Sequence, residues 1–148
     1  MRASRGGKDL PELKTWSLVV APSDCDLLGH MNVGRYLAAC GDGVFALQGA
    51  LGLTADDIRS GRRLSFAVVH MESDFKAELH LGEAVHLTSG VVEVGRRSAI
   101  FRHRMWRTET RELCFEATFK CVMMDLVARR ATEVPQDVRE TARAYAID

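Results

Sequence analysis

A long helix with one apolar stripe, followed by a run of strands, is the feature that most limits how this chain can fold. The spacing of the stripe predicts about five helical turns with one buried face. Gly52 is a typical C-terminal stop for such a helix. The stripe is spaced by 4, 3, 4, 3 and 4 positions and consists of Val33, Leu37, Cys40, Val44, Leu47 and Leu51.

The rest of the chain has to supply the apolar surface that this helix packs against. A short alternating strand with Trp16 and Leu18 precedes the helix, and Pro135 begins a short terminal helix. Short turns between the strands that follow the long helix favour antiparallel pairing. These strands are predicted at residues 64–79, 83–94, 98–106 and 113–126. The predicted class is therefore α+β, an antiparallel sheet packed on one central helix.

The length of 148 residues suits one domain, 1–148, and the polar residues 1–13 are predicted to be a flexible N-terminal segment. Gly41 and Gly43 lie in the middle of the long helix. Each costs about 1 kcal/mol of helix stability relative to alanine. A very close approach of another backbone, such as a sheet wrapped around the helix, is favoured as their reason over a functional hinge.

The charge and cysteine content narrow the class of protein. Twenty basic residues balance twenty acidic ones, so no global field attracts nucleic acid or an anionic membrane. No stretch resembles a secretory signal or a membrane span, which favours a cytoplasmic protein. The four cysteines form no C-x-x-C pattern, so neither a disulfide framework nor a metal site is predicted.

Polar groups are concentrated just ahead of the helix, in "DCDLLGHMNVGRY" at residues 24–36. Asn32 is in the N-cap position if the helix begins at Val33. The N–H groups of Val33 and Gly34 are then predicted to stay free at the positive end of the helix dipole, as donors to an oxyanion. Asp26 can project a carboxylate toward the same point, although aspartate is also common in turns for purely structural reasons.

The pattern D-x-D-x-x-G-H-M-N-x-x-x-Y from Asp24 to Tyr36, the long helix and "SDFKAELHLGEAV" together resemble one family. It is that of the hotdog-fold acyl-CoA thioesterases of the 4-hydroxybenzoyl-CoA thioesterase type. The resemblance implies a sheet wrapped around the helix, an acyl-CoA substrate and no cofactor. It also implies a homodimer or homotetramer with active sites at the subunit boundary.

The resemblance also implies roles for single residues. Asp26 matches the catalytic carboxylate, as nucleophile or general base, and the Val33 N–H matches the group that polarises the thioester carbonyl. Asp24 is interpreted as a turn or capping residue. Another subtype carries a catalytic glutamate on the helix, whereas this helix has Asp42 as its only acid. The sequence therefore favours the loop aspartate.

The roles of several other polar residues stay open. His30 can orient the thioester or relay a proton, or it can simply bond to the loop backbone. Tyr36 is expected to pack one turn into the helix with its hydroxyl near the pocket. His70 and Glu72 are predicted to share a strand face with Phe66, as a pocket wall, a subunit boundary or a strand end in solvent.

Coenzyme A carries phosphates, which require local cations. Arg96, Arg97 and Ser98 lie at a strand turn that matches the family's phosphate-binding position, although basic residues at turns are usually only solvated. Two other functions remain open, a hotdog enoyl-CoA hydratase and a non-catalytic acyl-CoA-binding protein. The hydratases space their aspartate and histidine by five positions, whereas Asp26 and His30 are four apart. The acyl group itself is not predicted.

Overall fold

The computed structural model of the protein describes residues 12–148. Most of the predicted flexible segment, residues 1–11, lies outside the described part. Leu13, at its end, is the first residue of a strand and pairs with Ser89. Within residues 12–148, no helix is long and apolar enough to cross a membrane.

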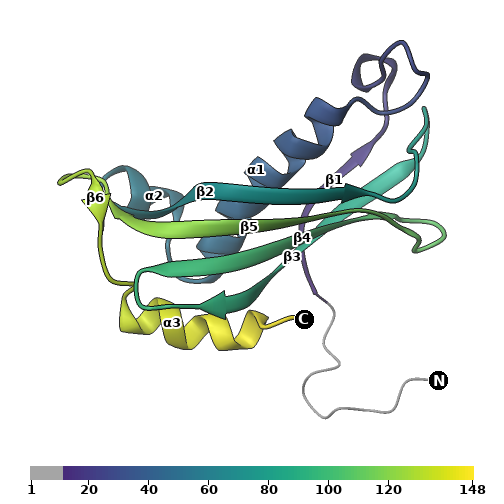
Figure 1. The fold of residues 1–148 in the computed structure, drawn as a ribbon. Coiled ribbons are helices and arrows are strands. Elements are labelled where there is room, and N and C mark those ends of the chain that lie inside the picture. The colour runs from purple at the N-terminus through teal and green to yellow at the C-terminus, as the bar shows by residue number, and fades with distance from the viewer. Residues whose placement is uncertain (1–11) are drawn as a thin grey trace, which may run out of the picture.

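The order of elements follows the predicted one closely (Figure 1). The long helix α1 spans Val33–Ala50, and Gly52 after it has a φ of 101°. The strands are β1 (Leu13–Val19), β2 (Leu64–Phe75), β3 (Ala84–Val94), β4 (Ser98–Arg107), β5 (Leu113–Asp125) and β6 (Arg130–Ala131). The short helices are α2 (Ala55–Arg59) and α3 (Gln136–Ala142), with 3-10 turns η1 (Pro22–Asp24) and η2 (Arg143–Tyr145).

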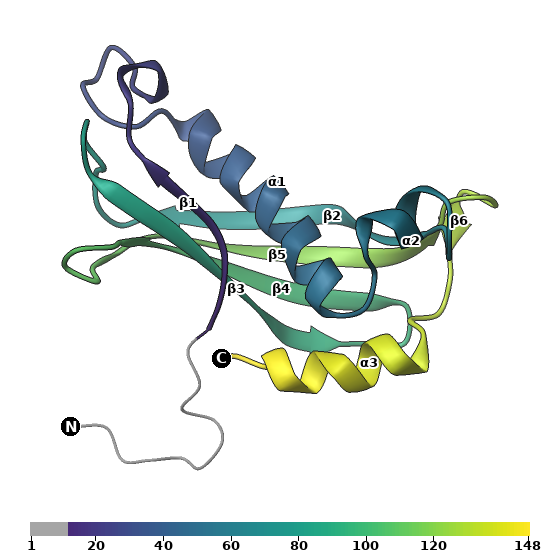
Figure 2. The same cartoon turned by 180° about the vertical axis from the view of Figure 1, so that it is seen from behind.

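The sheet is antiparallel, with the order β1-β3-β4-β5-β2 and with β6 paired to β5. It curls around α1, which crosses one of its faces (Figure 2). Strands β1 and β2 form the two edges of this path. The predicted α+β class and the hotdog arrangement of one helix in a curled sheet are confirmed.

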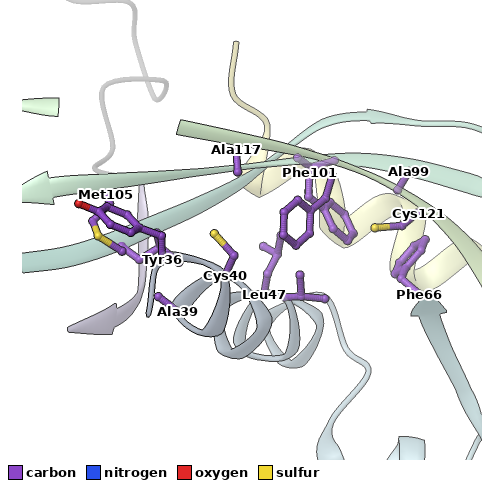
Figure 3. Close-up of a cluster of buried hydrophobic side chains, with 14 of the residues drawn as sticks. Tyr36, Ala39, Cys40, Leu47, Phe66, Ala99, Phe101, Met105, Ala117 and Cys121 are labelled. Atoms are coloured by element: carbon purple, nitrogen blue, oxygen red, sulfur yellow. The ribbon is translucent and has the colours of Figure 1, made fainter. Parts of the chain in front are cut away.

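The core lies between α1 and the inner face of the sheet (Figure 3). The predicted stripe holds from Cys40 onward, but Val33 and Leu37 are 53% and 39% exposed. Tyr36 is buried in their place, and its ring centroid lies 5.1 Å from that of Phe75 and 4.9 Å from that of Phe115. The helix start therefore turns an aromatic side chain, rather than its aliphatic ones, toward the sheet.

The two helix glycines have different environments. A Cβ added to Gly43 would lie 2.8 Å from Leu87 Cδ2 and 3.2 Å from both Ser89 Oγ and Thr15 Oγ1. The sheet does approach the helix closely there, but through side chains of β1 and β3 and not through the predicted backbone. A Cβ on Gly41 would meet nothing within 4 Å, so the prediction is wrong for this position.

A buried chain of polar groups lies beside Gly43. The Thr15 and Ser89 hydroxyls are 2.8 Å apart, and Ser89 Oγ is 2.6 Å from His103 Nδ1. Burial lowers the pKa of His103 to about 4, so this imidazole is neutral at physiological pH. The sheet therefore contacts the helix through apolar and neutral polar groups alike.

A β-bulge in β2 reverses which of its side chains face the core. Val68 pairs with the buried Cys121, but the next paired residue is His70, opposite the exposed Lys120. The extra residue, Val69, moves the following side chains to the opposite face. The prediction that His70 and Glu72 share a face with Phe66 is therefore wrong.

The contrast between the two glycines gives a matched test of helix packing. Gly41→Ala should raise the free energy of unfolding by about 0.5–1 kcal/mol, because it adds helix propensity in open space. Gly43→Ala should be less stable than Gly41→Ala by about 1–3 kcal/mol, because its methyl group overpacks the contact with Leu87. Urea denaturation of both variants measures the difference, and equal stabilisation would contradict the close approach.

Candidate active site

The polar loop ahead of α1 folds back on itself. Asp26 N–H donates to the His30 carbonyl at 3.2 Å, and Gly29 N–H donates to the Asp26 carbonyl at 3.0 Å. Gly29 has a φ of 84°, a conformation that glycine adopts without strain. The Met31 N–H donates to the Leu79 carbonyl at 2.7 Å, which fixes the loop to the segment after β2. The loop is thus held at both ends.

Asn32 joins this loop to the helix. Its side-chain Oδ1 accepts the Gly34 N–H at 2.8 Å, which is the predicted N-cap. Its Nδ2 donates to Asp26 Oδ2 at 2.9 Å. Both ends of the amide are therefore used, and the Asp26 carboxylate is fixed relative to the first turn of α1.

The Asp26 carboxylate is ionised at physiological pH. Its Oδ1 accepts the Leu28 N–H at 2.9 Å. This bond is the largest of the effects that lower the pKa of Asp26 below its ordinary value of 3.8. The bond from Asn32 and the nearby His30 lower it further. Hydrogen bonds to one lone pair on each oxygen leave the carboxylate able to accept further contacts.

One predicted oxyanion donor is corrected by the structure. The Gly34 N–H is not free, because it caps the helix through Asn32. A Cβ on Gly34 would lie 3.1 Å from Asn32 Oδ1, so the small residue leaves room for the cap. Within residues 12–148, the Val33 N–H has no hydrogen-bond acceptor. Val33 alone therefore presents a free amide at the positive end of the helix.

Asp24 has a structural role in this loop. Its Oδ2 accepts the Ala21 N–H at 2.8 Å, and its Oδ1 lies 3.0 Å from Arg35 Nε. The side chain is buried, unlike that of Asp26. These contacts agree with the interpretation of Asp24 as a turn and capping residue.

Asp26 and Val33 line a common pocket of ≈ 420 Å³ at the start of α1. Tyr36 forms part of its wall, and burial is the main cause that raises the pKa of this phenol to about 12. His30 lies in the same wall, with Nδ1 3.2 Å from the Met31 carbonyl. The remaining lining residues are Leu28, Met31, Phe75, Lys76, Ala77 and Glu78.

The other predicted binding residues do not reach this pocket. His70 and Glu72 lie on the outer face of β2, where His70 Nε2 is 3.2 Å from Glu72 Oε1. Arg96, Arg97 and Ser98 lie at the β3–β4 turn, at the far end of the sheet (Figure 1).

The register shows how far this turn is from the pocket. Ser98 pairs with Val122, whereas the pocket residue Phe75 pairs with Phe115. The seven residue steps from Phe115 to Val122 span roughly 23 Å of strand. Arg96 is bound by Glu133, with Nη2 2.6 Å from Oε1. One copy of the chain therefore does not bring this turn and the pocket together.

Sequence reasoning missed the pocket wall after β2. The strand was predicted to continue to residue 79, but it ends at Phe75. The N–H groups of Lys76 and Ala77 both donate to the Cys114 carbonyl, at 2.8 and 3.1 Å, which breaks the regular pairing. Glu78 enters the pocket as a result. No local sequence signal identified this irregularity.

Among residues 12–148, no group of three or more His, Cys, Asp or Glu side chains could hold a metal ion. The polar groups that line the pocket include the carboxylates of Asp26 and Glu78 and the imidazole of His30.

The model of the thioesterase-like superfamily matches residues 20–141, and the chain belongs to this superfamily. A comparison with curated proteins gave no match.

Solved structures share the fold at low sequence identity. A hypothetical protein from Staphylococcus aureus, solved in complex with CoA, has a TM-score of 0.81 and 15% identity over 92% of this chain and 85% of that one. A 1,4-dihydroxy-2-naphthoyl-CoA thioesterase from Synechocystis has a TM-score of 0.73 and 19% identity over 86% and 93%. A probable thioesterase from Escherichia coli has a TM-score of 0.74 and 18% identity over 91% and 99%.

The two bonds of Asn32 can be separated by mutation. Asn32→Ser keeps a capping oxygen but removes the amide that donates to Asp26, so the pKa of Asp26 should rise toward 3.8 with little loss of stability. Asn32→Ala should raise the same pKa and also lower the free energy of unfolding by about 1 kcal/mol. Carboxylate NMR titration and urea denaturation measure the two effects. An Asp26 pKa that stays unchanged in both variants would contradict the bond.

Proposed function

We propose that this protein is an acyl-CoA thioesterase, which hydrolyses a thioester to a carboxylic acid and free coenzyme A. The observation that carries the proposal is that Asp26 and Val33, whose N–H has no acceptor among the described residues, line one pocket. Membership of the thioesterase-like superfamily supports it. The CoA complex of the similar Staphylococcus aureus protein supports a CoA-type substrate.

The proposed mechanism assigns separate tasks to these two groups. The Val33 N–H and the helix dipole bind the carbonyl oxygen as negative charge develops on it. Asp26, ionised and fixed by Asn32, either attacks the carbonyl carbon to form a mixed anhydride or takes a proton from an attacking water. Both routes leave the electron pair of the C–S bond on the departing sulfur. In the first route a water then hydrolyses the mixed anhydride, which releases the acid and restores the Asp26 carboxylate. No cofactor is proposed, because each task falls to a group of the chain.

The location of the acid favours the 4-hydroxybenzoyl-CoA thioesterase type within this family. The proposed catalytic acid lies on the loop before α1, not on the helix. Asp42, the only acid of α1, is exposed and is absent from the pocket lining. We therefore infer that the chain uses the loop-aspartate version of the reaction.

The central prediction concerns the Asp26 carboxylate. Asp26→Asn should lower the rate of thiol release from acyl-CoA by at least about 100-fold, because the group that attacks or activates water is lost. The matched control is Asp74→Asn, since Asp74 is exposed on the outer face of β2. Thiol trapping with aromatic, short branched, medium-chain and betaine-like acyl-CoAs measures turnover.

The outcomes of this assay separate the candidate functions. Activity of Asp26→Asn within a few-fold of the parent would remove Asp26 from the mechanism. Addition of water to crotonyl-CoA without thiol release would identify a hydratase. Thermal stabilisation by acyl-CoA without any turnover would identify a binding protein.

We also propose that the protein assembles as a homodimer or homotetramer in the cytoplasm. Exposed apolar side chains on the β2 edge and on α1 support the assembly, with Val69, Phe75 and Phe45 exposed by 65%, 52% and 58%. The free state of all four cysteines agrees with a reducing compartment. Acyl-CoA is the proposed small-molecule partner, and neither nucleic acid nor a membrane surface is proposed.

Assembly would also explain a remote phosphate site. Arg96, Arg97 and Ser98 lie too far from the pocket of their own chain, so we propose that they bind the CoA phosphates at the pocket of another copy. The double variant Arg96→Ala with Arg97→Ala should raise KM for acyl-CoA about 10-fold and change kcat less, because the contacts are remote from the reacting carbon. Steady-state kinetics on the intact oligomer measure both constants. An unchanged KM would place the phosphate site elsewhere.

A further inference from the structure

Glu78 brings a second carboxylate to the pocket that contains Asp26 and His30. Its backbone position is fixed, because Arg107 Nη2 donates to the Glu78 carbonyl at 2.9 Å. Arg107 is itself held by ion pairs with Glu83 and Glu112. The segment that carries Glu78 is therefore anchored, although it lies beyond the end of β2.

The Glu78 carboxylate lies between two imidazoles. Its Oε2 is 3.2 Å from His80 Nε2, and its Oε1 is 3.8 Å from His30 Nε2. The other ring nitrogen of His80 is 3.2 Å from Glu83 Oε1. Lys76 and Asp26 are the other charged groups that line the same pocket. A row of side chains from Arg107 through Glu83 and His80 thus orients Glu78 toward His30.

The contacts of His30 define what its two nitrogens can do. Nδ1 is 3.2 Å from the Met31 carbonyl, which can only accept a hydrogen bond, so Nδ1 carries a proton. Nε2 faces the Glu78 carboxylate at 3.8 Å, beyond hydrogen-bond length. At this distance the negative charge attracts positive charge that develops on the ring, without occupying the hydrogen bond of Nε2. That N–H is left available to a substrate atom.

We propose that Glu78 is a positioning residue for the thioesterase reaction, acting through His30 so that the imidazolium donates its Nε2 proton to the departing sulfur. The inference rests on the proposed function. As the C–S bond breaks, its electron pair stays on sulfur, which takes the proton and leaves as the free thiol. His30 becomes neutral and regains a proton from water. The new bond to the acyl carbon comes either from the attacking water or from Asp26, and in the second case a water then hydrolyses the mixed anhydride and restores the carboxylate. In both routes water and thioester become acid and thiol.

A double-mutant cycle tests this role with the full-length protein. Glu78→Gln should lower kcat for acyl-CoA hydrolysis by about 10-fold with KM within about twofold, because a step after binding is impaired. In the background of His30→Gln, the same change should alter kcat by less than about twofold. The matched control is Glu72→Gln, since Glu72 contacts His70 at 3.2 Å on the outer face of the sheet. It should leave both constants unchanged.

Each other result overturns the inference in a distinct way. Equal losses from Glu78→Gln with and without His30 would show that Glu78 acts independently of the imidazole. A rise in KM at constant kcat would make it a binding contact, and full activity of a folded Glu78→Gln variant would leave it no role. Circular dichroism melting checks folding for every variant. Thiol release by the parent protein is measured first. A parent that releases no thiol overturns the proposed function and this inference together, whereas an active parent leaves the variants to test the inference alone.

Discussion

The site depends on the side chain of Asn32, which makes two hydrogen bonds that connect the catalytic loop to the central helix. One bond caps the helix at Gly34, and the other holds the carboxylate of Asp26. A single planar amide makes both hydrogen bonds. The amide and its two bonds therefore fix the distance between the Asp26 carboxylate and the first turn of the helix. The Val33 amide remains free because the cap uses the next one. The cap thus selects which amide can face a substrate.

The sheet and the helix together determine where this site can open. Near Gly43 the side chains of β1 and β3 lie so close to α1 that an added methyl group would have to displace them. At the helix start, by contrast, Tyr36 packs against Phe75 and leaves the pocket beside it. The same helix is therefore held in the core along its middle and offers its positive end to a ligand. The polar residues of the loop would not form the pocket without this packing of the helix against the sheet.

Much of this organisation follows from the sequence because it depends on local periodicity. The helix bounds, the succession of strands along the chain and the loop with Asp26 and Asn32 follow from spacing and capping preferences. The order of the strands within the sheet, with β2 beside β5, does not. The faces of β2 do not either, because a bulge at Val69 depends on pairing with β5, and no pattern within β2 reveals it. The contribution of Glu78 was missed for the same reason, since the break after Phe75 is made by a carbonyl of another strand. The sequence also does not reveal which amide of the first turn the Asn32 side chain binds, because that depends on the three-dimensional position of the side chain. In the structure it binds the Gly34 N–H.

The most direct test of this catalytic arrangement is a crystal structure of the protein with a non-hydrolysable acyl-CoA analogue that keeps the carbonyl group. The arrangement places the carbonyl oxygen about 3 Å from the Val33 nitrogen and an Asp26 oxygen, or a water bound to it, about 3–3.5 Å from the carbonyl carbon. An analogue whose carbonyl binds away from the helix start, with the Asp26 carboxylate directed into solvent, would contradict it.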